Sequence, residues 1–213
     1  MAERSSMHDM LEVQKYKSLI VDYVQFLHNM FTVGTDTSSS TTKWTITELI
    51  WNPRILAQVQ QEIDTTVGQE RNIKEEDLSH LPYLQVVIKE TFRLYPSTPF
   101  SLPRVATESC EIFRYHIPKG ATLLVNVWAI ARDSNEWVDP LEFRPERFLQ
   151  DDEKAKVDIR GNDFEVIPFG VGRRICVGLS LGLRMVQLLT ATLVHSFNWE
   201  LEHGLNPKKL NMD

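Results

Sequence analysis

Residues 169–178 place one cysteine in a glycine-rich stretch with the spacing FxxGxRxCxG. The fixed positions are Phe169, Gly172, Arg174, Cys176 and Gly178. Glycines let the backbone approach a flat ligand closely or take positive φ, and an arginine offers a fork of donors to a carboxylate. An apolar helical pattern follows, so the thiolate would lie near a helix N-terminus, which stabilises negative sulfur. These residue types predict a thiolate ligand for a haem iron, with Arg174 on a propionate and Phe169 covering the sulfur.

Two other interpretations of this loop are open. A lone cysteine in a glycine-rich turn is often a buried structural residue. The loop could also bind a dinucleotide, but after Gly170 and Gly172 and two intervening residues the third glycine of that motif is missing. The complete spacing favours the haem ligand over both.

A second candidate group consists of Glu90 and Arg93, which lie on one face of a helix predicted over residues 82–94. Most such pairs are exposed salt bridges of little consequence. A Pro-Glu-Arg-Phe stretch follows at residues 145–148 and offers a further arginine, Arg147.

A third candidate is the hydroxyl-rich run at residues 33–42, which begins just before Gly34. By composition alone it favours a flexible linker. The alternative is one long helix, opened locally at Gly34, in which Thr37 bonds back to the carbonyl four residues earlier. Apolar residues at helical spacing on both sides, from Ile20 to Phe31 and from Trp44 to Ile50, suit this alternative.

Together these motifs resemble those of the cytochrome P450 family of haem-thiolate monooxygenases. The resemblance implies haem b (iron protoporphyrin IX) with Cys176 as its proximal ligand, and a thiolate there favours O–O bond cleavage. It also implies that Glu90, Arg93 and Arg147 form a buried triad that holds the haem loop rigid. The further cofactor contacts that it implies are Phe169, Gly170, Arg174, Gly178 and Arg104.

The resemblance extends to residues 33–38, which match the motif on the distal helix of that family. It implies that Thr37 donates a hydrogen bond in the oxygen-binding groove and that Asp36 relays protons from solvent. Val33 replaces the usual alanine or glycine and would crowd that groove. The implied substrate pocket consists of Phe31, Val33, Thr98, Phe100, Ser101 and Leu102.

Longer stretches, at residues 115–132, 161–168 and 179–197, resemble the branch of the family that hydroxylates plant flavonoids at the 3' position of the B ring. That branch implies a flavonoid substrate, O2, and electrons from NADPH through cytochrome P450 reductase. It also implies the cytosolic face of the endoplasmic reticulum membrane, with an anchor that lies outside this chain.

Family members are more than twice as long, so we expect residues 1–213 to form one partial domain. It would run from the distal helix to the helix after the haem loop, without the N-terminal half and the last strands. The competing interpretation is a non-catalytic remnant, either a truncated product or a partial gene model. A helical interaction module would leave the Cys176 loop unexplained.

The composition of the chain excludes several classes of partner and site. The 213 residues suffice for a core, and the net charge of −6 argues against a nucleic-acid partner. Two cysteines, Cys110 and Cys176, offer neither a disulfide framework nor a zinc cluster and favour a reducing compartment. The most apolar stretch, residues 177–197, is interrupted by Arg184 and predicts a helix buried in protein rather than in lipid.

The predicted elements are mainly helical, at residues 18–50, 53–67, 82–94 and 176–197. Asn52 is expected as the N-cap of the second helix, whose buried stripe would be Leu56, Val59, Ile63 and Val67. Residues 111–117 and 121–127 flank a turn at 118–120 and predict a hairpin. We expect residues 74–77 to be solvated, residues 134–163 to be irregular and residues 198–201 to form a strand. The fold class is α+β, mainly α, with a small sheet.

Overall fold

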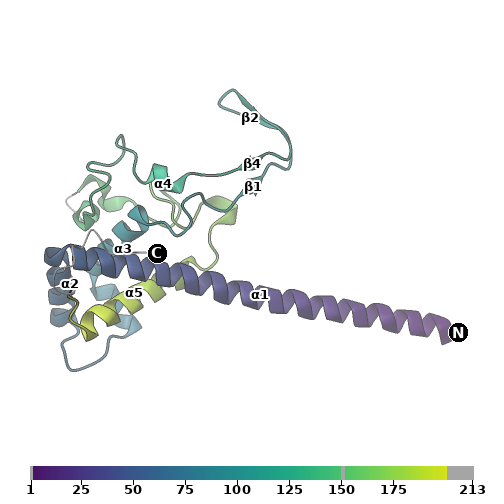
Figure 1. Cartoon of the computed structure of the whole chain (residues 1–213), viewed down its shortest axis with the longest axis horizontal. Coiled ribbons are helices and arrows are strands. Elements are labelled where there is room, and N and C mark those ends of the chain that lie inside the picture. Colours follow the sequence, from purple (N-terminus) through teal and green to yellow (C-terminus); the bar gives the residue numbers. More distant parts are fainter. Residues whose placement is uncertain (1, 150–151, 201–213) are drawn as a thin grey trace. The chain divides into compact units, whose positions relative to one another are not determined.

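The computed structural model describes residues 2–149 and 152–200 (Figure 1). The chain divides into two compact units, residues 1–37 and residues 38–213, and each is described by itself. The first unit belongs to helix α1 (Ala2–Trp51), which continues into the second unit. The α+β class with mainly helical content is confirmed.

The hydroxyl-rich run is helical, so the linker prediction is wrong and the long-helix alternative is confirmed. The reason is that the hydroxyls bond back to carbonyls four residues earlier, which leaves the run compatible with a helix. Thr37 bonds to the Val33 carbonyl at 2.7 Å, and Thr45 bonds to the Thr41 carbonyl at 2.8 Å. The helical pattern is unbroken at Gly34, so the expected local opening is absent there.

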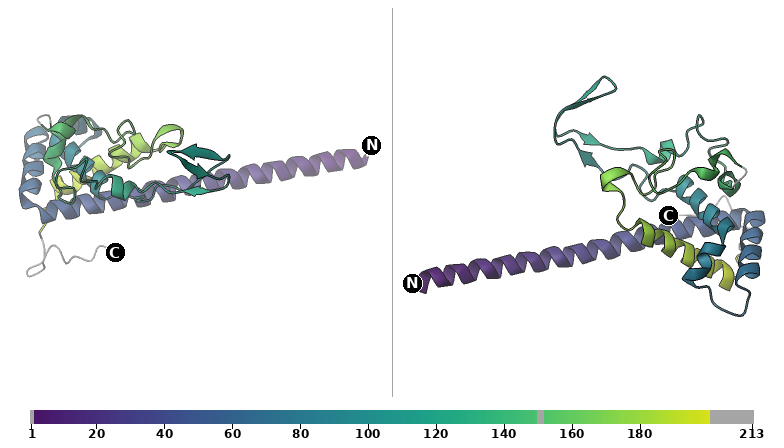
Figure 2. Two further views of the ribbon diagram at one scale, coloured as in Figure 1. Left: turned by 90° about the horizontal axis from the view of Figure 1, so that it is seen from above. Right: turned by 180° about the vertical axis from the view of Figure 1, so that it is seen from behind.

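The core of the second unit lies between the end of α1 and three further helices, α2 (Pro53–Thr66), α3 (Pro82–Leu94) and α5 (Leu179–Ser196). These three helices contact one another, and they gather at one end of the unit in both views of Figure 2. Val59 and Ile63 are buried as predicted, whereas Ile55 is buried in place of the half-buried Leu56. Val67, the last residue of the predicted stripe, is also half-buried.

The boundaries of α2 and α3 follow local signals. Pro53 and Pro82 stand at the first helical positions, and Gly68 ends α2 with a φ of +76°. Asn52 occupies the predicted cap position of α2, but its side chain does not cap that helix. It donates instead to the Glu48 carbonyl at 2.9 Å and so finishes α1.

The strand pairing differs from the prediction. The hairpin consists of β2 (Cys110–Ile112) and β3 (Tyr115–Ile117), and β1 (Arg104–Val105) pairs with β4 (Thr122–Leu123), both antiparallel. The hairpin turns at Phe113 and Arg114, with φ values of +48° and +72°, because two positive φ values suit the twist of paired strands. The predicted turn at 118–120 joins β3 to β4 instead.

The remaining elements are short: a helical turn α4 (Val127–Ile130) and the 3-10 helices η1 (Glu75–His80), η2 (Pro145–Phe148), η3 (Glu153–Lys156) and η4 (Gly172–Arg174). The prediction of a solvated stretch at 74–77 is wrong for Asp77, which is buried and binds Arg71 at 2.7 Å. Residues 198–200 are not in a strand, and position 201 lies outside the described residues. Of the helices in the described part of the chain, none is both long and apolar enough to cross a bilayer.

Candidate haem-binding site

Cys176 lies three residues before α5, at the end of the glycine-rich loop. The Cys176 amide donates to the Phe169 carbonyl at 2.9 Å and closes the loop. Gly170 and Gly172 take φ values of +71° and +67°, a region that side chains disfavour. Cys176 is a free cysteine and an exposed residue. The loop therefore holds Cys176 at the surface on a hydrogen-bonded backbone.

Gly178 leaves the space beside the sulfur open. A Cβ built on Gly178 would lie 3.8 Å from the Cys176 Sγ, in ordinary van der Waals contact. A larger side chain there would cover the thiol from the side of α5. Gly178 is also the N-cap residue of α5, so Cys176 lies just before the N-terminus of that helix.

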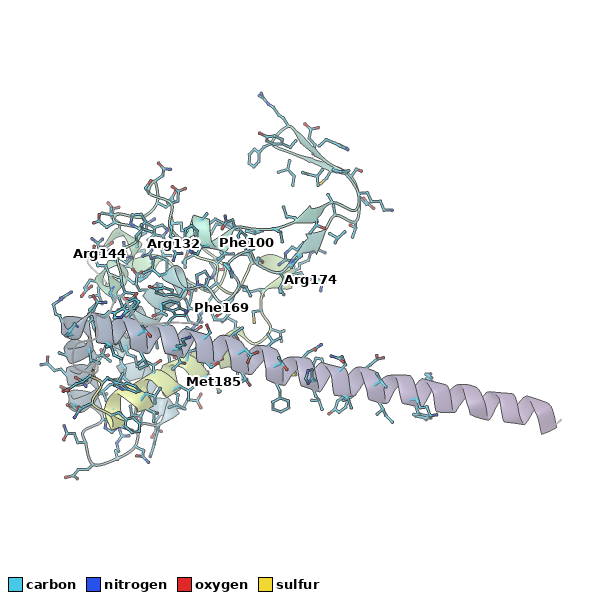
Figure 3. All side chains as sticks on the ribbon, viewed as in Figure 1. Phe100, Arg132, Arg144, Phe169, Arg174 and Met185 are labelled. Carbon is cyan, nitrogen blue, oxygen red and sulfur yellow. The ribbon has the colours of Figure 1, made fainter. Side chains whose placement is uncertain are left out.

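Two arginines adjoin the loop. Arg174 is exposed on η4, and Figure 3 shows its side chain at the end of the loop. Arg104 comes from β1, and its Nη2 lies 4.0 Å from a Cβ built on Gly170. The sequence separation of Arg104 from the loop is large, yet the fold brings its guanidinium against the Gly170 backbone.

Phe169 ties the loop to the helices. Its ring lies 5.0 Å from the ring of Phe92 on α3, and its Cε1 is 3.9 Å from a Cβ built on Gly182 of α5. Phe169 thus packs inward (Figure 3), while Cys176 remains exposed. Its contacts anchor the loop on α3 and α5.

The predicted triad is brought together in the core. Glu90, Arg93 and Arg147 are all buried. The Glu90 carboxylate receives Arg93 Nε and Nη2 at 2.7 and 2.8 Å, and Arg147 Nε at 3.1 Å. Burial lowers the pKa of the Arg147 guanidinium, and the Glu90 charge partly restores it. A single carboxylate therefore serves two buried cations.

Backbone carbonyls satisfy the remaining guanidinium donors. Arg93 donates to the carbonyls of Ala131 and Pro140 at 2.7 and 2.8 Å, and Arg147 donates to that of Val138 at 2.9 Å. These acceptors lie in the irregular stretch before η2. Because a buried donor without an acceptor is costly, the triad fixes the path of residues 131–142.

Two further carboxylates, those of Glu62 and Glu146, bind the start of helix α3. The sequence gives no local signal for either contact. Glu62 of α2 accepts from the Tyr83 and Leu84 amides at 2.7 and 2.9 Å and so caps α3 from another element. Glu146 of η2 accepts from the Tyr83 hydroxyl at 3.0 Å and from Arg54 at 2.8 Å.

The predicted substrate and distal residues fall in both units. Phe31, Val33, Asp36 and Thr37 lie on α1 in the first unit, where Phe31, Val33 and Asp36 are exposed. Residues 98–102 belong to the second unit. They form an open segment in which Phe100 and Leu102 are exposed and Ser101 has a φ of +56°.

The donors of the loop fit an iron-bearing macrocycle with carboxylate groups. An exposed cysteine on a glycine loop lets a flat ligand reach the sulfur, and the guanidiniums of Arg104 and Arg174 suit carboxylates. The three groups come from β1, from η4 and from Cys176, three residues before α5. It is the arrangement expected of a haem-thiolate site.

Comparison with known proteins defines the class. Residues 7–213 match the sequence profile described as Cytochrome P450, and the chain belongs to that family. The fold agrees: a solved zebra fish cytochrome P450 structure with progesterone has a TM-score of 0.75 and 34% sequence identity, covering 84% of this chain and 40% of that one. The expected family is therefore confirmed.

The chain is also similar to curated proteins whose names give a substrate class. The flavonoid 3'-monooxygenase of Petunia hybrida is 68% identical over 187 residues, and that of Arabidopsis thaliana is 63% identical over 187 residues. A flavonoid 3',5'-hydroxylase of Eustoma exaltatum is 53% identical over 193 residues. The chain covers 36% of the length of the Petunia and Arabidopsis relatives, and 88% of it is matched.

Proposed function

We propose that this chain is the haem-binding part of a monooxygenase that inserts one oxygen atom from O2 into an aromatic C–H bond. The observation that carries the proposal is the exposed Cys176 at the end of a closed glycine loop, with Arg104 against that loop. The substrate is a flavonoid, and the reacting position is 3' on its B ring. The 68% identity to the Petunia flavonoid 3'-monooxygenase supports this substrate over the 3',5' pattern of the relative at 53%.

In this proposal each group on the chain has a physical task. Cys176 binds the iron of haem b as a thiolate, which the N-terminus of α5 stabilises. Arg104 and Arg174 bind the propionates. Bound haem supplies the redox chemistry with O2 that amino-acid side chains lack. The triad holds residues 131–147, so that the loop keeps one geometry.

In this proposal two residues of α1 deliver the protons. The Thr37 hydroxyl carries one proton and donates it in a hydrogen bond to the Val33 carbonyl. Asp36 is exposed and exchanges protons with solvent. Reduction of O2 to water alongside oxygen insertion consumes protons, so an acid next to a hydroxyl is a suitable pair. Electrons come from NADPH through cytochrome P450 reductase, at the cytosolic face of the endoplasmic reticulum membrane.

The test uses two proteins. One is the chain of residues 1–213 with added haemin. The other is a chimera in which the matched 187 residues of this chain replace their counterparts in the Petunia relative. Cys176→His should abolish the thiolate-type Soret band of the reduced, CO-bound chimera, whereas Cys110→His, at the other exposed cysteine, should leave it intact. An unchanged band in Cys176→His would contradict the ligand assignment, and absence of naringenin 3'-hydroxylation by the chimera would contradict the substrate.

A second candidate is that residues 1–213 alone are a partial domain that does not catalyse. Exposed apolar side chains favour it: Val177, Leu181, Met185 and Leu189 recur every four residues from the Cys176 loop along α5. In the first unit Ile20, Val24, Phe31 and other apolar residues of α1 are exposed as well. Naringenin turnover by the haemin-loaded chain, with a thiolate CO spectrum, would rule this candidate out.

A further inference from the structure

A second buried carboxylate lies near the triad, on α1. Glu48 is 5% exposed, and its carboxylate accepts hydrogen bonds from the Tyr95 hydroxyl and, at 3.0 Å, from Asn52 Nδ2. Burial raises the pKa of the Glu48 carboxyl, the charge of Glu90 raises it further, and the two hydrogen bonds lower it in part. A buried carboxylate is costly unless its partners are fixed. The Tyr95 hydroxyl is one of those partners.

Tyr95 is held by its ring as well as by its hydroxyl. The ring stacks on Trp44, one helical turn before Glu48, with centroids 4.1 Å apart and planes inclined by 7°. Burial and the Glu48 hydrogen bond raise the pKa of the Tyr95 phenol, so it stays protonated and donates. One face of α1 therefore fixes both the plane and the end of this side chain.

Tyr95 stands where α3 ends and the segment with the exposed Phe100 and Leu102 begins. It is the C-cap residue of α3, and the buried Pro96 follows it. Tyr95 has φ −126° and ψ 60°, outside the helical region that a following proline disfavours, so its position sets the direction of the chain beyond it. The hydroxyls of Thr41 and Ser97 lie 3.3 Å apart, one turn of α1 from Trp44. Thus α1 contacts the chain at Tyr95 and again at Ser97.

Beyond Ser97, residues 98–102 make two backbone hydrogen bonds. The Trp128 amide donates to the Pro99 carbonyl at 3.1 Å, and the Ser101 amide donates to the Thr98 carbonyl at 2.9 Å. Phe100 and Leu102 remain exposed. The place of these side chains therefore depends strongly on where the segment starts.

We propose that Glu48 and Tyr95 are positioning residues for the substrate pocket, because their hydrogen bond fixes the start of residues 97–102 against α1. The inference rests on the proposed function, which assigns those residues to the pocket. Neither residue touches the reacting atoms. Their effect is on substrate affinity, through the placement of the pocket wall.

Tyr95→Phe tests the proposal because it keeps the ring that stacks on Trp44 and removes only the donor to Glu48. In the chimera we expect naringenin to bind on the order of tenfold more weakly, the loss of roughly one hydrogen bond, with the CO spectrum unchanged. Amide hydrogen exchange should accelerate in residues 97–102 but not in residues 82–94, both in the chimera and in the chain alone.

The matched control is Tyr83→Phe. Tyr83 lies on α3, the helix that Tyr95 terminates, and its hydroxyl likewise donates to a carboxylate, that of Glu146, but residues 97–102 are not involved. Conservative rescue gives a second comparison: Glu48→Gln retains an oxygen that accepts from Tyr95 and should keep the parent's affinity, whereas Glu48→Leu should behave like Tyr95→Phe.

The outcomes separate the inference from the function on which it rests. If Tyr95→Phe matches Tyr83→Phe in naringenin affinity and in exchange at 97–102, the positioning role is wrong and the proposed function stands. If the parent chimera binds haem through the thiolate but shows no naringenin response, the flavonoid assignment fails. Exchange in residues 97–102 then still decides whether Glu48 and Tyr95 fix that segment.

Discussion

Arg93 binds both oxygens of the Glu90 carboxylate, at 2.7 and 2.8 Å, and both side chains are completely buried. Arg147 reaches the same carboxylate from 57 residues away, so three ionised groups share one site in the core. Two cations on one anion are tolerated because backbone carbonyls of the irregular stretch accept the remaining guanidinium donors. The stretch and the triad therefore depend on each other.

Glu90→Gln should lower the free energy of unfolding by roughly 3–5 kcal/mol, because two buried guanidiniums lose their counter-ion. Denaturant unfolding of the chain and of the chimera measures the change. Glu75→Gln is the matched control, since Glu75 pairs with Arg184 at the surface, and such a pair is worth less than about 1 kcal/mol. Equal losses in the two variants would contradict the triad's role.

Thr37→Ala in the chimera should uncouple NADPH consumption from hydroxylation, with peroxide replacing product, if Thr37 supplies a proton. Product and peroxide are measured per NADPH consumed. Thr47→Ala is the control because its hydroxyl makes the same bond, to the Lys43 carbonyl at 2.8 Å. Coupling that stays at the parent's level in Thr37→Ala would leave Thr37 with the helical role alone.

Gly161→Ala should disturb the Cys176 loop although it lies outside the motif. Its Cβ would lie 3.0 Å from the Gly170 carbonyl oxygen and from Ile175 Cδ1, and its φ is +85°. Overpacking should add roughly 1–3 kcal/mol to a backbone strain of about 1–2 kcal/mol. Gly68→Ala has a φ of +76° and nothing within 4 Å, so it isolates the strain. Weaker haemin binding in Gly161→Ala than in Gly68→Ala is the expected result, and equal binding would contradict it.

Replacing Phe113 and Arg114 by Asn and Gly should stabilise the hairpin by roughly 1 kcal/mol. Both positions have positive φ, and Phe113 is 92% exposed, so it contributes little packing to offset the strain. Thermal unfolding and hydrogen exchange in β2 and β3 measure the gain. A loss of stability would mean that the Phe113 ring packs on a surface of the intact protein.

The contributions of Glu48 and Asp77 to stability should change with pH in opposite directions, because the pKa of Glu48 is raised and that of Asp77 is lowered. Burial raises the pKa of Glu48, so its contribution to stability is complete below the unfolded pKa and is lost as pH rises through the raised pKa. The free energy of unfolding of Glu48→Gln should therefore improve relative to the parent as pH rises above the unfolded pKa of a glutamate, about 4.3.

The pKa of Asp77 is shifted in the opposite direction to that of Glu48. Hydrogen bonds from Arg71 and the Lys74 amide lower the pKa of its carboxyl, so its contribution is present above the unfolded pKa and fades as pH falls. Asp77→Asn should thus lose most stability at neutral pH, and the deficit should shrink in acid. Parallel pH profiles for the two variants would contradict this assignment.

The sequence by itself determined the features that depend on neighbouring residues. Pro82 and the need to stop before Pro96 predicted α3 over residues 82–94, as observed. The spacing around Cys176 predicted a glycine loop before a helix, as observed. These signals are local, because φ restrictions and helix boundaries act over a few residues. The triad was implied only by the family resemblance of the motifs at 90–93 and 145–148, and the fold does assemble it.

Only the tertiary structure decided the features that join distant residues. Strand β1 paired with β4 across the whole intervening hairpin, a pairing that no local signal indicates. Glu48 found Tyr95 across 47 positions, and Arg104 reached Gly170. Burial supplies the reason: a carboxylate or guanidinium taken out of water must find a partner, and packing of the helices decides which one it meets.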